Sequence, residues 1–212
     1  MMQAATATPV IHVVDDEAPF RRSLVFLLES MGWQAVGHAS AEAFLEAAPE
    51  LPAAGGCLVL DIRMPRLSGL ELQRRLKAAQ SLFPVLFMTG HGDVDLAVQA
   101  MKEGAVDFLQ KPFKDQQMLD AVERAIQLSC ERHQASRRCQ GARELLARLS
   151  PRESEVAKQV ALGLANKEVA RDLGISENTV HVHRQHIMEK TDTGSAAELA
   201  RLILRADPSG LD

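Results

Sequence analysis

The chain has 212 residues, enough for one large domain or two modest ones. Apolar residues make up 46% and charged residues 25%, values typical of globular proteins, which excludes collagen-like, disordered and disulfide-scaffold classes. The net charge is −4, and aromatic residues make up only 4%, which argues against a stacking platform for single-stranded nucleic acid. No apolar run approaches the ~18 residues of a membrane helix, and no secretory signal is visible. The three cysteines form no CxxC pair, so we expect a cytoplasmic protein with reduced thiols.

Up to about residue 125, short apolar runs alternate with segments of helical spacing. Each run has four or five residues, the length of a buried strand. Five β–α repeats predict an α/β doubly wound domain over residues 8–128, with helices on both faces of a parallel sheet. The runs are Val10–Val14, Gln34–Gly37, Cys57–Leu60, Pro84–Met88 and Val106–Leu109.

The rest of the chain has no strand pattern. Over residues 129–146 the apolar periodicity fades, and we predict a linker, for which a continuation of the fifth helix is an open alternative. Residues 147–212 predict an all-α domain of four helices, the first capped by Ser150 with Pro151 at its first position. The predicted helices are Pro151–Leu162, Asn166–Leu173, Glu177–Lys190 and Ser195–Leu204.

Acidic side chains directly follow two of the predicted strands. Asp15 and Asp16 follow the first strand, and Asp61 follows the third. Ligands of parallel sheets bind beyond the carboxyl ends of the strands, and adjacent strands lie about 4.8 Å apart. If the first and third strands are neighbours, the three carboxylates converge. Thr89 and Lys111 follow the fourth and fifth strands at the same edge.

Converging carboxylates repel each other, by roughly 1 kcal/mol for a pair about 4 Å apart in water and up to about 4 kcal/mol at an effective dielectric constant of 20. A hard divalent cation relieves this repulsion, and Mg²⁺ is the usual choice where phosphate also binds. The pattern therefore predicts Mg²⁺ as a cofactor and Asp61 as a nucleophile that attacks phosphorus and becomes an aspartyl phosphate. Lys111 would supply positive charge, and Thr89 a hydroxyl donor, to the phosphoryl oxygens. Taken singly, an acidic pair after a strand is equally typical of a solvated loop or a helix cap.

Residues 10–125 resemble the receiver domain of bacterial two-component response regulators. The matching segments are HVVDDE, LVLDIRMPRLSG, VLFMTGHGD and AVDFLQKPF, with the spacings between them. The resemblance implies a strand order of 2-1-3-4-5 and phosphorylation at Asp61. It implies that Asp16 and Asp61 ligate Mg²⁺ directly, that Asp15 acts through water, and that the backbone carbonyl of Arg63 completes the protein ligands. It also implies a switch role for Thr89, after the fourth strand, and for Phe108, in the fifth strand. A phosphate contact for Lys111 and a cis Lys111–Pro112 bond are implied as well.

Three other protein classes with related features fit these residues poorly. A flavodoxin binds a flavin phosphate just after the first strand, where Asp15, Asp16 and Glu17 would repel it. A haloacid-dehalogenase-like phosphatase has a second carboxylate two residues after its nucleophile, where this chain has Arg63. No GxxxxGK[ST] segment supports a P-loop ATPase. We therefore expect no turnover of a separate substrate.

The second and third helices of the all-α domain are joined by a short turn that contains Gly174, which predicts a helix-turn-helix. At 100° per residue, Val180, His183 and Ile187 share the inward face of the third helix. The opposite face carries candidates for base contacts, and three further residues of the two helices lie better for phosphate contacts. The predicted base contacts are Asn178, His181, Val182 and Gln185, and the predicted phosphate contacts are Lys167, Thr179 and Arg184.

Two other interpretations of this helix stay open. Any solvated helical face can carry such polar residues, and Glu177 and Glu189 leave the helix near neutral. A histidine metal site is a weaker alternative, because His181 and His183 point about 200° apart and only His183 and His186 share a side.

Residues 148–205 resemble the four-helix output domain of the NarL/LuxR type, through RLSPRESEVAKQVALGLANKEVARDLGISENTVHVHRQHIMEK. Together with the receiver segment GHGDVDLAVQAMKEGAVDFLQKPF, the whole chain resembles the FixJ subfamily. The resemblance implies base contacts from His181, Val182 and Gln185 and dimer contacts from Ser195–Leu204. Thr191–Gly194 departs from the loop usual in the family.

The resemblance implies a phosphorylation switch. A sensor histidine kinase would donate a phosphoryl group to Asp61, after which Thr89, Lys111 and Phe108 reshape the surface of Val94–Gly104 and Val106–Gln110. A homodimer would form on that face and bind double-stranded promoter DNA. RNA polymerase is a further candidate partner, and we expect no contact with a membrane. In an alternative hypothesis, the receiver acts through protein contacts and the helical domain only dimerises.

Overall fold

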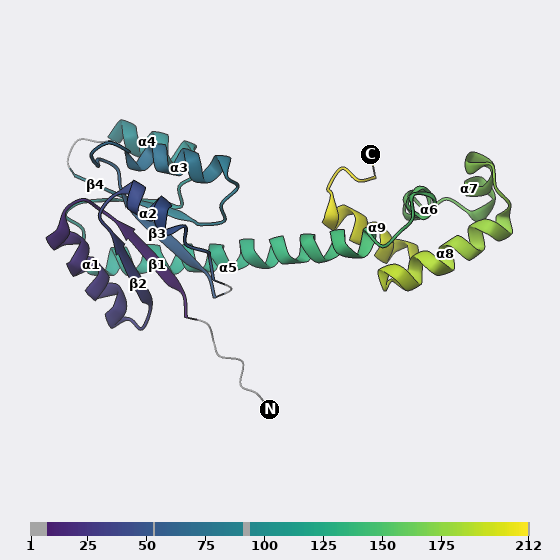
Figure 1. Ribbon diagram of the computed structural model, residues 1–212, viewed down its shortest axis with the longest axis horizontal. Helices are drawn as coiled ribbons and strands as arrows, with labels where there is room; N and C mark the ends of the chain where they lie inside the picture. The colour runs from purple at the N-terminus through teal and green to yellow at the C-terminus, as the bar shows by residue number, and fades with distance from the viewer. Residues whose placement is uncertain (1–7, 53, 91–93, 212) are drawn as a thin grey trace, which may run out of the picture. The chain divides into compact units, whose positions relative to one another are not determined.

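The computed structural model describes residues 8–52, 54–90 and 94–211 (Figure 1). Contacts divide the chain into two compact units, residues 1–133 and 134–212. His91–Asp93 of the GHGD segment and the first seven residues, used above in the receiver and signal-peptide arguments, lie outside the described residues. No helix in the described part of the chain is long and apolar enough to cross a membrane.

The first unit is built on a five-stranded parallel sheet of order β2-β1-β3-β4-β5. This confirms the predicted doubly wound fold and strand order. β1 pairs with β2 and β3, so that Val14 lies opposite both His38 and Leu60. The strands are β1 (Val10–Val14), β2 (Gln34–His38), β3 (Gly56–Asp61), β4 (Val85–Thr89) and β5 (Asp107–Gln110).

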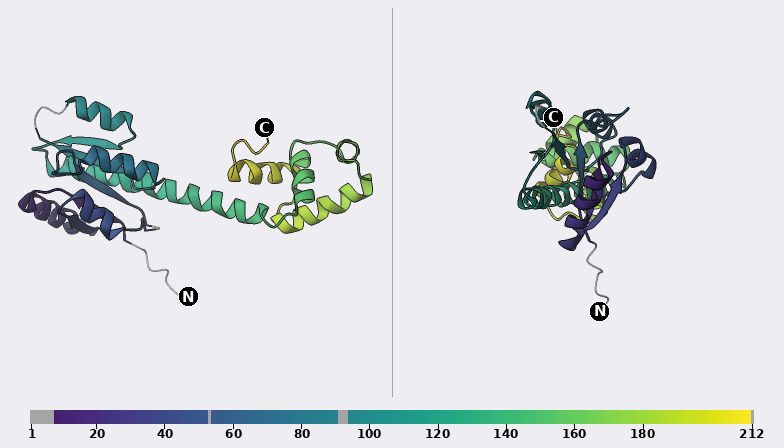
Figure 2. Two further views of the ribbon diagram at one scale, coloured as in Figure 1. Left: turned by 45° about the horizontal axis from the view of Figure 1, so that its top comes forward. Right: turned by 90° about the vertical axis from the view of Figure 1, so that its left-hand side faces the viewer.

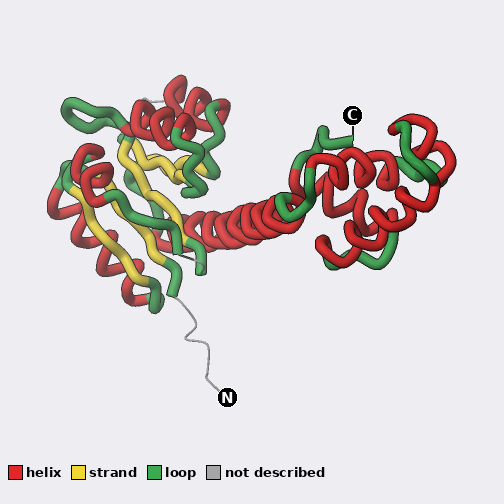
Figure 3. The backbone as a smooth tube through the Cα atoms, turned by 45° about the vertical axis from the view of Figure 1, so that its right-hand side comes forward, coloured by secondary structure: helices red, strands yellow, loops and turns green. Residues whose placement is uncertain are grey.

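Helices cover both faces of the sheet, as the tube view in Figure 3 shows. Side chains alternate along each strand, so Leu58 and Leu60 face one core while Cys57 and Val59 face the other. α1 and α5 pack on the core that contains Cys57, and α2, α3 and α4 pack on the opposite one. The helices are α1 (Ala18–Ser30), α2 (Ala41–Ala47), α3 (Gly69–Ala78), α4 (Val94–Lys102) and α5 (Asp115–Leu146).

Helix α5 continues through the segment predicted as a linker and ends at Leu146. Ser129 is buried against the first unit, where its hydroxyl accepts a hydrogen bond from the Gly56 amide at 3.1 Å. Ala142, near the end of the helix, packs on Leu202 and Ala206 of the second unit. The contact boundary after residue 133 therefore falls inside one helix, and the domain borders proposed from the sequence stay predictions.

The second unit contains the helices α6 (Pro151–Ala161), α7 (Asn166–Leu173), α8 (Glu177–Thr191) and α9 (Ala196–Ala206), seen in two orientations in Figure 2. The core between them includes Val156, Val169, Val180 and Leu199. Serine side chains cap three of the four helices, and Ser150 forms the predicted cap with Pro151 at the first position of α6. Gly174 ends α7 in the left-handed conformation (φ 65°), which glycine adopts at low cost and which separates α7 from α8.

Candidate functional site

The ammonium group of Lys111 joins two acidic side chains at the carboxyl edge of the sheet. It donates to Oδ2 of Asp15 at 2.7 Å and to Oδ1 of Asp61 at 2.8 Å. Asp15 follows β1, Asp61 ends β3 and Lys111 follows β5, so three strands bring these residues together. Asp15 is 1% exposed and Asp61 is 8% exposed, so Asp61 is the more accessible of the two carboxylates.

Main-chain contacts fix the orientation of both carboxylates. Oδ1 of Asp15 accepts from the amide of Glu17, and Oδ2 of Asp61 accepts from the amide of Arg63, each at 2.8 Å. The guanidinium of Arg21 donates to the main-chain carbonyl of Asp15 at 2.5 Å. Each strand end is therefore held by its own loop, which leaves the remaining carboxylate oxygens directed at Lys111.

Burial and charge act in opposite directions on the pKa values of this cluster. Burial raises the pKa of Asp61, and the hydrogen bond from Lys111 only partly offsets that effect. Burial alone would lower the pKa of Lys111, but its hydrogen bonds to Asp15 and Asp61 and their charges outweigh burial, and the net shift is upward. Lys111 therefore stays protonated and positively charged between the two carboxyl groups.

The other two residues expected to act as a switch lie at the end of β4 and within β5. Thr89 is 2% exposed at the end of β4, and its carbonyl accepts from the amide of Lys111 at 2.6 Å. Phe108 lies opposite Phe87 in the β4–β5 register and packs, half-buried, against the core that α3 and α4 cover. The Lys111–Pro112 bond is cis, as the resemblance implied.

The residues expected to hold Mg²⁺ are only partly assembled. The described part of the chain has no group of three or more His, Cys, Asp and Glu side chains arranged to hold a metal ion. Asp15 and Asp61 meet at Lys111, whereas Asp16 is exposed and lines an open hollow together with Arg63. Mg²⁺ is usually bound by one or two carboxylates with water and phosphate oxygens, and this all-oxygen donor set fits that chemistry.

The predicted inward and outward faces of α8 match the burial in the structure. Val180 and Ile187 are fully buried, and His183 is half-buried. The residues expected to touch bases, Asn178, His181, Val182 and Gln185, are all exposed. Val182 is 43% exposed, so its side chain is accessible from solvent.

The residues expected to touch phosphates differ in their surroundings. Lys167 and Thr179 are exposed, and the hydroxyl groups of Thr179 and Ser176 are hydrogen-bonded at 2.8 Å. Arg184 is half-buried, and its Nη1 donates to Oδ1 of Asn166 at 3.2 Å. Sequence periodicity could not identify this contact, because it depends on how α7 packs against α8.

A second contact missed from the sequence fixes the C-terminal end of α8. The carboxylate of Glu153, in α6, accepts from the Lys190 ammonium at 2.7 and 2.8 Å and from the Ser150 amide at 2.8 Å. The hydrogen bond from Lys190 is the largest of the effects that lower the pKa of Glu153 to about 2. The capping sequence Ser-x-x-Glu at residues 150–153 was the available signal for the α6 half of this contact.

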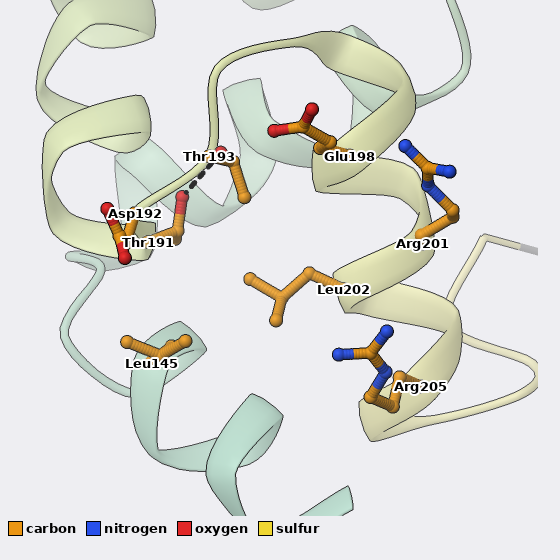
Figure 4. Close-up of a pocket in the computed structure, with 8 residues that line it drawn as sticks. All are labelled: Leu145, Thr191, Asp192, Thr193, Glu198, Arg201, Leu202 and Arg205. Atoms are coloured by element: carbon orange, nitrogen blue, oxygen red, sulfur yellow. Dashed lines mark hydrogen bonds between the residues drawn. The ribbon is translucent and has the colours of Figure 1, made fainter. Parts of the chain in front are cut away.

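A pocket in the second unit lies where the ends of α5 and α8 meet α9 (Figure 4). Leu202 lines it together with Thr191 and Thr193, whose hydroxyl groups are hydrogen-bonded to each other at 2.9 Å. Two acidic and two basic side chains line it, so it has no net charge that would favour a charged ligand. The lining residues are Leu145, Thr191, Asp192, Thr193, Glu198, Arg201, Leu202 and Arg205.

The sheet, with two acids and a lysine at its carboxyl edge, and the helix-turn-helix unit define a receiver joined to a DNA-binding domain. Residues 11–123 match the family described as the response regulator receiver domain, and residues 147–203 match the family described as bacterial regulatory proteins, luxR family. The chain therefore belongs to the two-component response regulators that regulate transcription by binding DNA.

Relatives of FixJ type match nearly the whole chain. The transcriptional regulatory protein FixJ of Bradyrhizobium diazoefficiens is 47% identical over 92% of this chain and 95% of its own length. FixJ of Rhizobium meliloti is 45% identical over 92% of this chain and 94% of its own. Among solved structures, the response regulator StyR is 43% identical with a TM-score of 0.79, covering 93% of this chain and 98% of its own. Full-length FixJ from B. japonicum is 47% identical with a TM-score of 0.58, covering 94% and 98%.

Proposed function

We propose that Asp61 accepts a phosphoryl group from a sensor histidine kinase and that this modification controls DNA binding. The observation that carries the proposal is the position of Asp61, at the carboxyl edge of β3 and hydrogen-bonded to Lys111. In the reaction, a carboxylate oxygen of Asp61 forms a bond to phosphorus while the bond between phosphorus and the donor breaks, and the leaving group keeps that electron pair.

Each neighbouring residue has a separate part in this step. Asp15, Asp16, Asp61 and the main-chain carbonyl of Arg63 would hold Mg²⁺, which when bound offsets negative charge on the phosphoryl group. Lys111 exchanges its contact with the Asp61 carboxylate for a phosphoryl oxygen, because a flexible ammonium follows the negative charge. The buried Thr89 hydroxyl offers a donor at the end of β4.

The proposed switch passes from the acceptor to the α4–β5 face. Thr89 and Lys111, drawn to the phosphoryl oxygens, release space into which Phe108 turns, and the surface of α4 and β5 changes so that two chains dimerise there. Moving such an equilibrium from 1:99 to 99:1 takes about 5.5 kcal/mol of differential stabilisation. A few charge-assisted hydrogen bonds at roughly 1.5–3 kcal/mol each supply that amount.

Acetyl phosphate with Mg²⁺ tests the acceptor. We expect the wild-type chain to take up one phosphoryl group and Asp61→Asn to take up none, because the amide is not a nucleophile at phosphorus. Label retained by Asp61→Asn would remove Asp61 from the acceptor role. Release of many equivalents of phosphate per minute from phosphate esters would instead indicate an enzyme with a separate substrate.

The exposed face of α8 is proposed to read promoter DNA in the major groove. Asn178 and Gln185 suit adenine, His181 can donate or accept a hydrogen bond, and Val182 suits a thymine methyl group. Thr179 and Arg184 of α8 and Lys167 of α7 are proposed to contact phosphates. RNA polymerase is a candidate partner of the bound protein.

Gel shifts with promoter fragments, with and without phosphorylation, test this part. Gln185→Ala should change the base preference, whereas Arg184→Ala should weaken binding to all sequences alike. Binding that is the same with and without phosphorylation would contradict control by Asp61. No binding in either state would favour a receiver that acts through protein contacts alone.

A further inference from the structure

One side-chain hydrogen bond links the two helices of the helix-turn-helix. Nη1 of Arg184, on α8, donates to Oδ1 of Asn166, the first residue of α7, at 3.2 Å. Both side chains are half-buried. Arg184 lies one residue before the exposed Gln185 and one after the half-buried His183, which places it at the edge of α8 between the outward and inward faces.

The partner of Arg184 is neutral, whereas two other arginines of the same unit pair with carboxylates. Arg152 forms an ion pair with Glu155, and Arg171 forms one with Asp172. Among the described residues, no acidic side chain forms an ion pair with Arg184 within 4.0 Å. The amide oxygen of Asn166 occupies one of the five N–H donors of the guanidinium and leaves its full positive charge in place.

We infer that Asn166 is a positioning residue for DNA binding, which holds the Arg184 guanidinium at the edge of α8 without neutralising its charge. The inference rests on the proposed phosphate contact of Arg184. A long side chain that is held in place before binding loses less conformational freedom when it binds. A carboxylate at position 166 would hold the guanidinium more tightly but would compete with the phosphate for its charge.

The two substitutions Asn166→Asp and Asn166→Ala separate orientation from charge. Binding of the full chain, treated with acetyl phosphate and Mg²⁺, is measured by fluorescence anisotropy between about 50 and 200 mM salt. The probes are a fluorescein-labelled duplex of mixed sequence and duplexes that the wild-type chain selects from a random pool. Gln134→Glu, on the exposed surface of α5, adds the same charge difference in the same unit and serves as the control.

Asn166→Asp should weaken binding to every duplex by the same factor, roughly eightfold at 0.1 M salt for one lost phosphate contact, since each contact contributes about 0.9 to the slope of log K against log salt. That slope should fall by about one, while the melting temperature of the free chain does not fall. Asn166→Ala should weaken binding less and leave the slope unchanged, because the charge remains. Gln134→Glu should change neither quantity.

A double-mutant cycle completes the test. In an Arg184→Ala background, Asn166→Asp should have no further effect on affinity or slope. An equal effect of Asn166→Asp with and without Arg184, or no effect on either quantity, would overturn the inference while DNA binding itself stands. If Asn166→Asp does not fold, the inference is tested by Asn166→Ala, and unchanged DNA affinity of that variant would be enough to overturn it. Absence of DNA binding by the wild-type chain would overturn both the inference and the proposed function.

Discussion

Gly69 allows the first turn of α3 to pass directly over the main chain of β3, the strand that ends in Asp61. A Cβ atom at this position would lie 2.3 Å from the carbonyl oxygen of Asp61 and 3.0 Å from Cγ of Leu60. The Gly69 amide also donates to the carbonyl of Ile62 at 3.0 Å. The position of Asp61 therefore depends on a residue eight places further along the chain that has no side chain.

Gly69→Ala should destabilise the receiver by roughly 1–3 kcal/mol, because the added methyl group must displace either α3 or β3. It should also slow labelling of Asp61 by acetyl phosphate. Gly141→Ala is the matched control, since it lies inside α5 with open space around it and should stabilise the helix by about 0.5–1 kcal/mol. Chemical denaturation and radiolabel uptake measure both variants, and equal behaviour of the two would contradict this account.

The polar residues at the carboxyl edge of the sheet could be found from the sequence because each follows an apolar run directly. Their common location follows from one rule, that the carboxyl ends of parallel strands lie at the same edge of a sheet. It applies to Asp15, Asp61, Thr89 and Lys111. The sequence could not show that Lys111 binds both carboxylates or that Asp16 stays exposed, because strand ends fix positions and not side-chain directions.

At the scale of helices and strands, β1 and β2 share a buried pair of histidines. Nδ1 of His12 and Nε2 of His38 are 3.0 Å apart, and Phe44 and Phe83 pack edge-on against the His12 ring. Burial, and then the charge of His38, lowers the pKa of His12 to about 4 from its ordinary value of 6.5. The unfolded chain therefore binds a proton at this residue at a higher pH than the folded chain does.

The sign of this shift predicts that acid destabilises the receiver. The contribution of a neutral His12 should be complete above pH 6.5 and should be lost as the pH falls from 6.5 to about 4, by an amount on the order of 3 kcal/mol. Denaturation of the wild type and of His12→Leu across this range measures it. The variant should show a smaller change in unfolding free energy with pH, whatever its stability at neutral pH, and parallel curves would contradict the prediction.

Helices α6 and α8 are joined by the buried carboxylate of Glu153 and by Lys190. The hydrogen bond from Lys190 lowers the pKa of Glu153 to about 2, so the stabilisation is complete above the ordinary value of 4.5 and is lost as the pH falls through about 2. Glu153→Gln should lower the unfolding free energy of the second unit by roughly 2 kcal/mol at neutral pH. This difference from the wild type should shrink below pH 4.5.

Glu155→Gln provides the control for this prediction. Its carboxylate is 54% exposed and pairs with Arg152 on the same helix, so its removal should change the stability by less than about 1 kcal/mol. Circular dichroism at the helix band during denaturation measures both variants. Equal losses for Glu153→Gln and Glu155→Gln would show that burial of the α6–α8 contact adds nothing.

The predicted helices and strands agree with the structure except at their ends, and residues 129–146 take the helical alternative that the sequence left open. β3 includes Asp61, which was placed just after the strand, because pairing with Met88 of β4 extends the ladder by one residue. The residue at which a strand ends therefore depends on its pairing with the neighbouring strand and not on the sequence of the segment itself. The contacts that join distant segments, Ser129 with Gly56 and Arg184 with Asn166, depend likewise on helix packing that no single-segment pattern records.

For the whole molecule, the proposed dimer would connect phosphorylation of Asp61 with DNA binding, because a dimer makes more contacts to DNA phosphates than a monomer does. Val98 and Met101 of α4 are 47% and 45% exposed, so this helix presents apolar side chains to solvent on the face proposed for dimerisation. A dimer brings two copies of α8 to DNA, and two recognition helices bind two half-sites one helical turn apart. The phosphate contacts, and with them the salt dependence, should therefore double.

Met101→Glu should prevent the dimer without preventing phosphorylation. A carboxylate in the interface repels the same carboxylate of the second chain, whereas Met101 lies on α4 and Asp61 at the end of β3. We expect the wild type to double its mass on acetyl phosphate treatment, measured by light scattering, and Met101→Glu to stay monomeric with an equal phosphoryl content. The slope of log K against log salt should be about twice as steep for the phosphorylated wild type as for the phosphorylated variant. Equal slopes for the two would show that α4 does not set the number of bound DNA-reading helices. Lys102→Glu is the control, because it changes the charge of the same helix and leaves Val98 and Met101 intact. It therefore separates the effect of added negative charge from the loss of apolar contact.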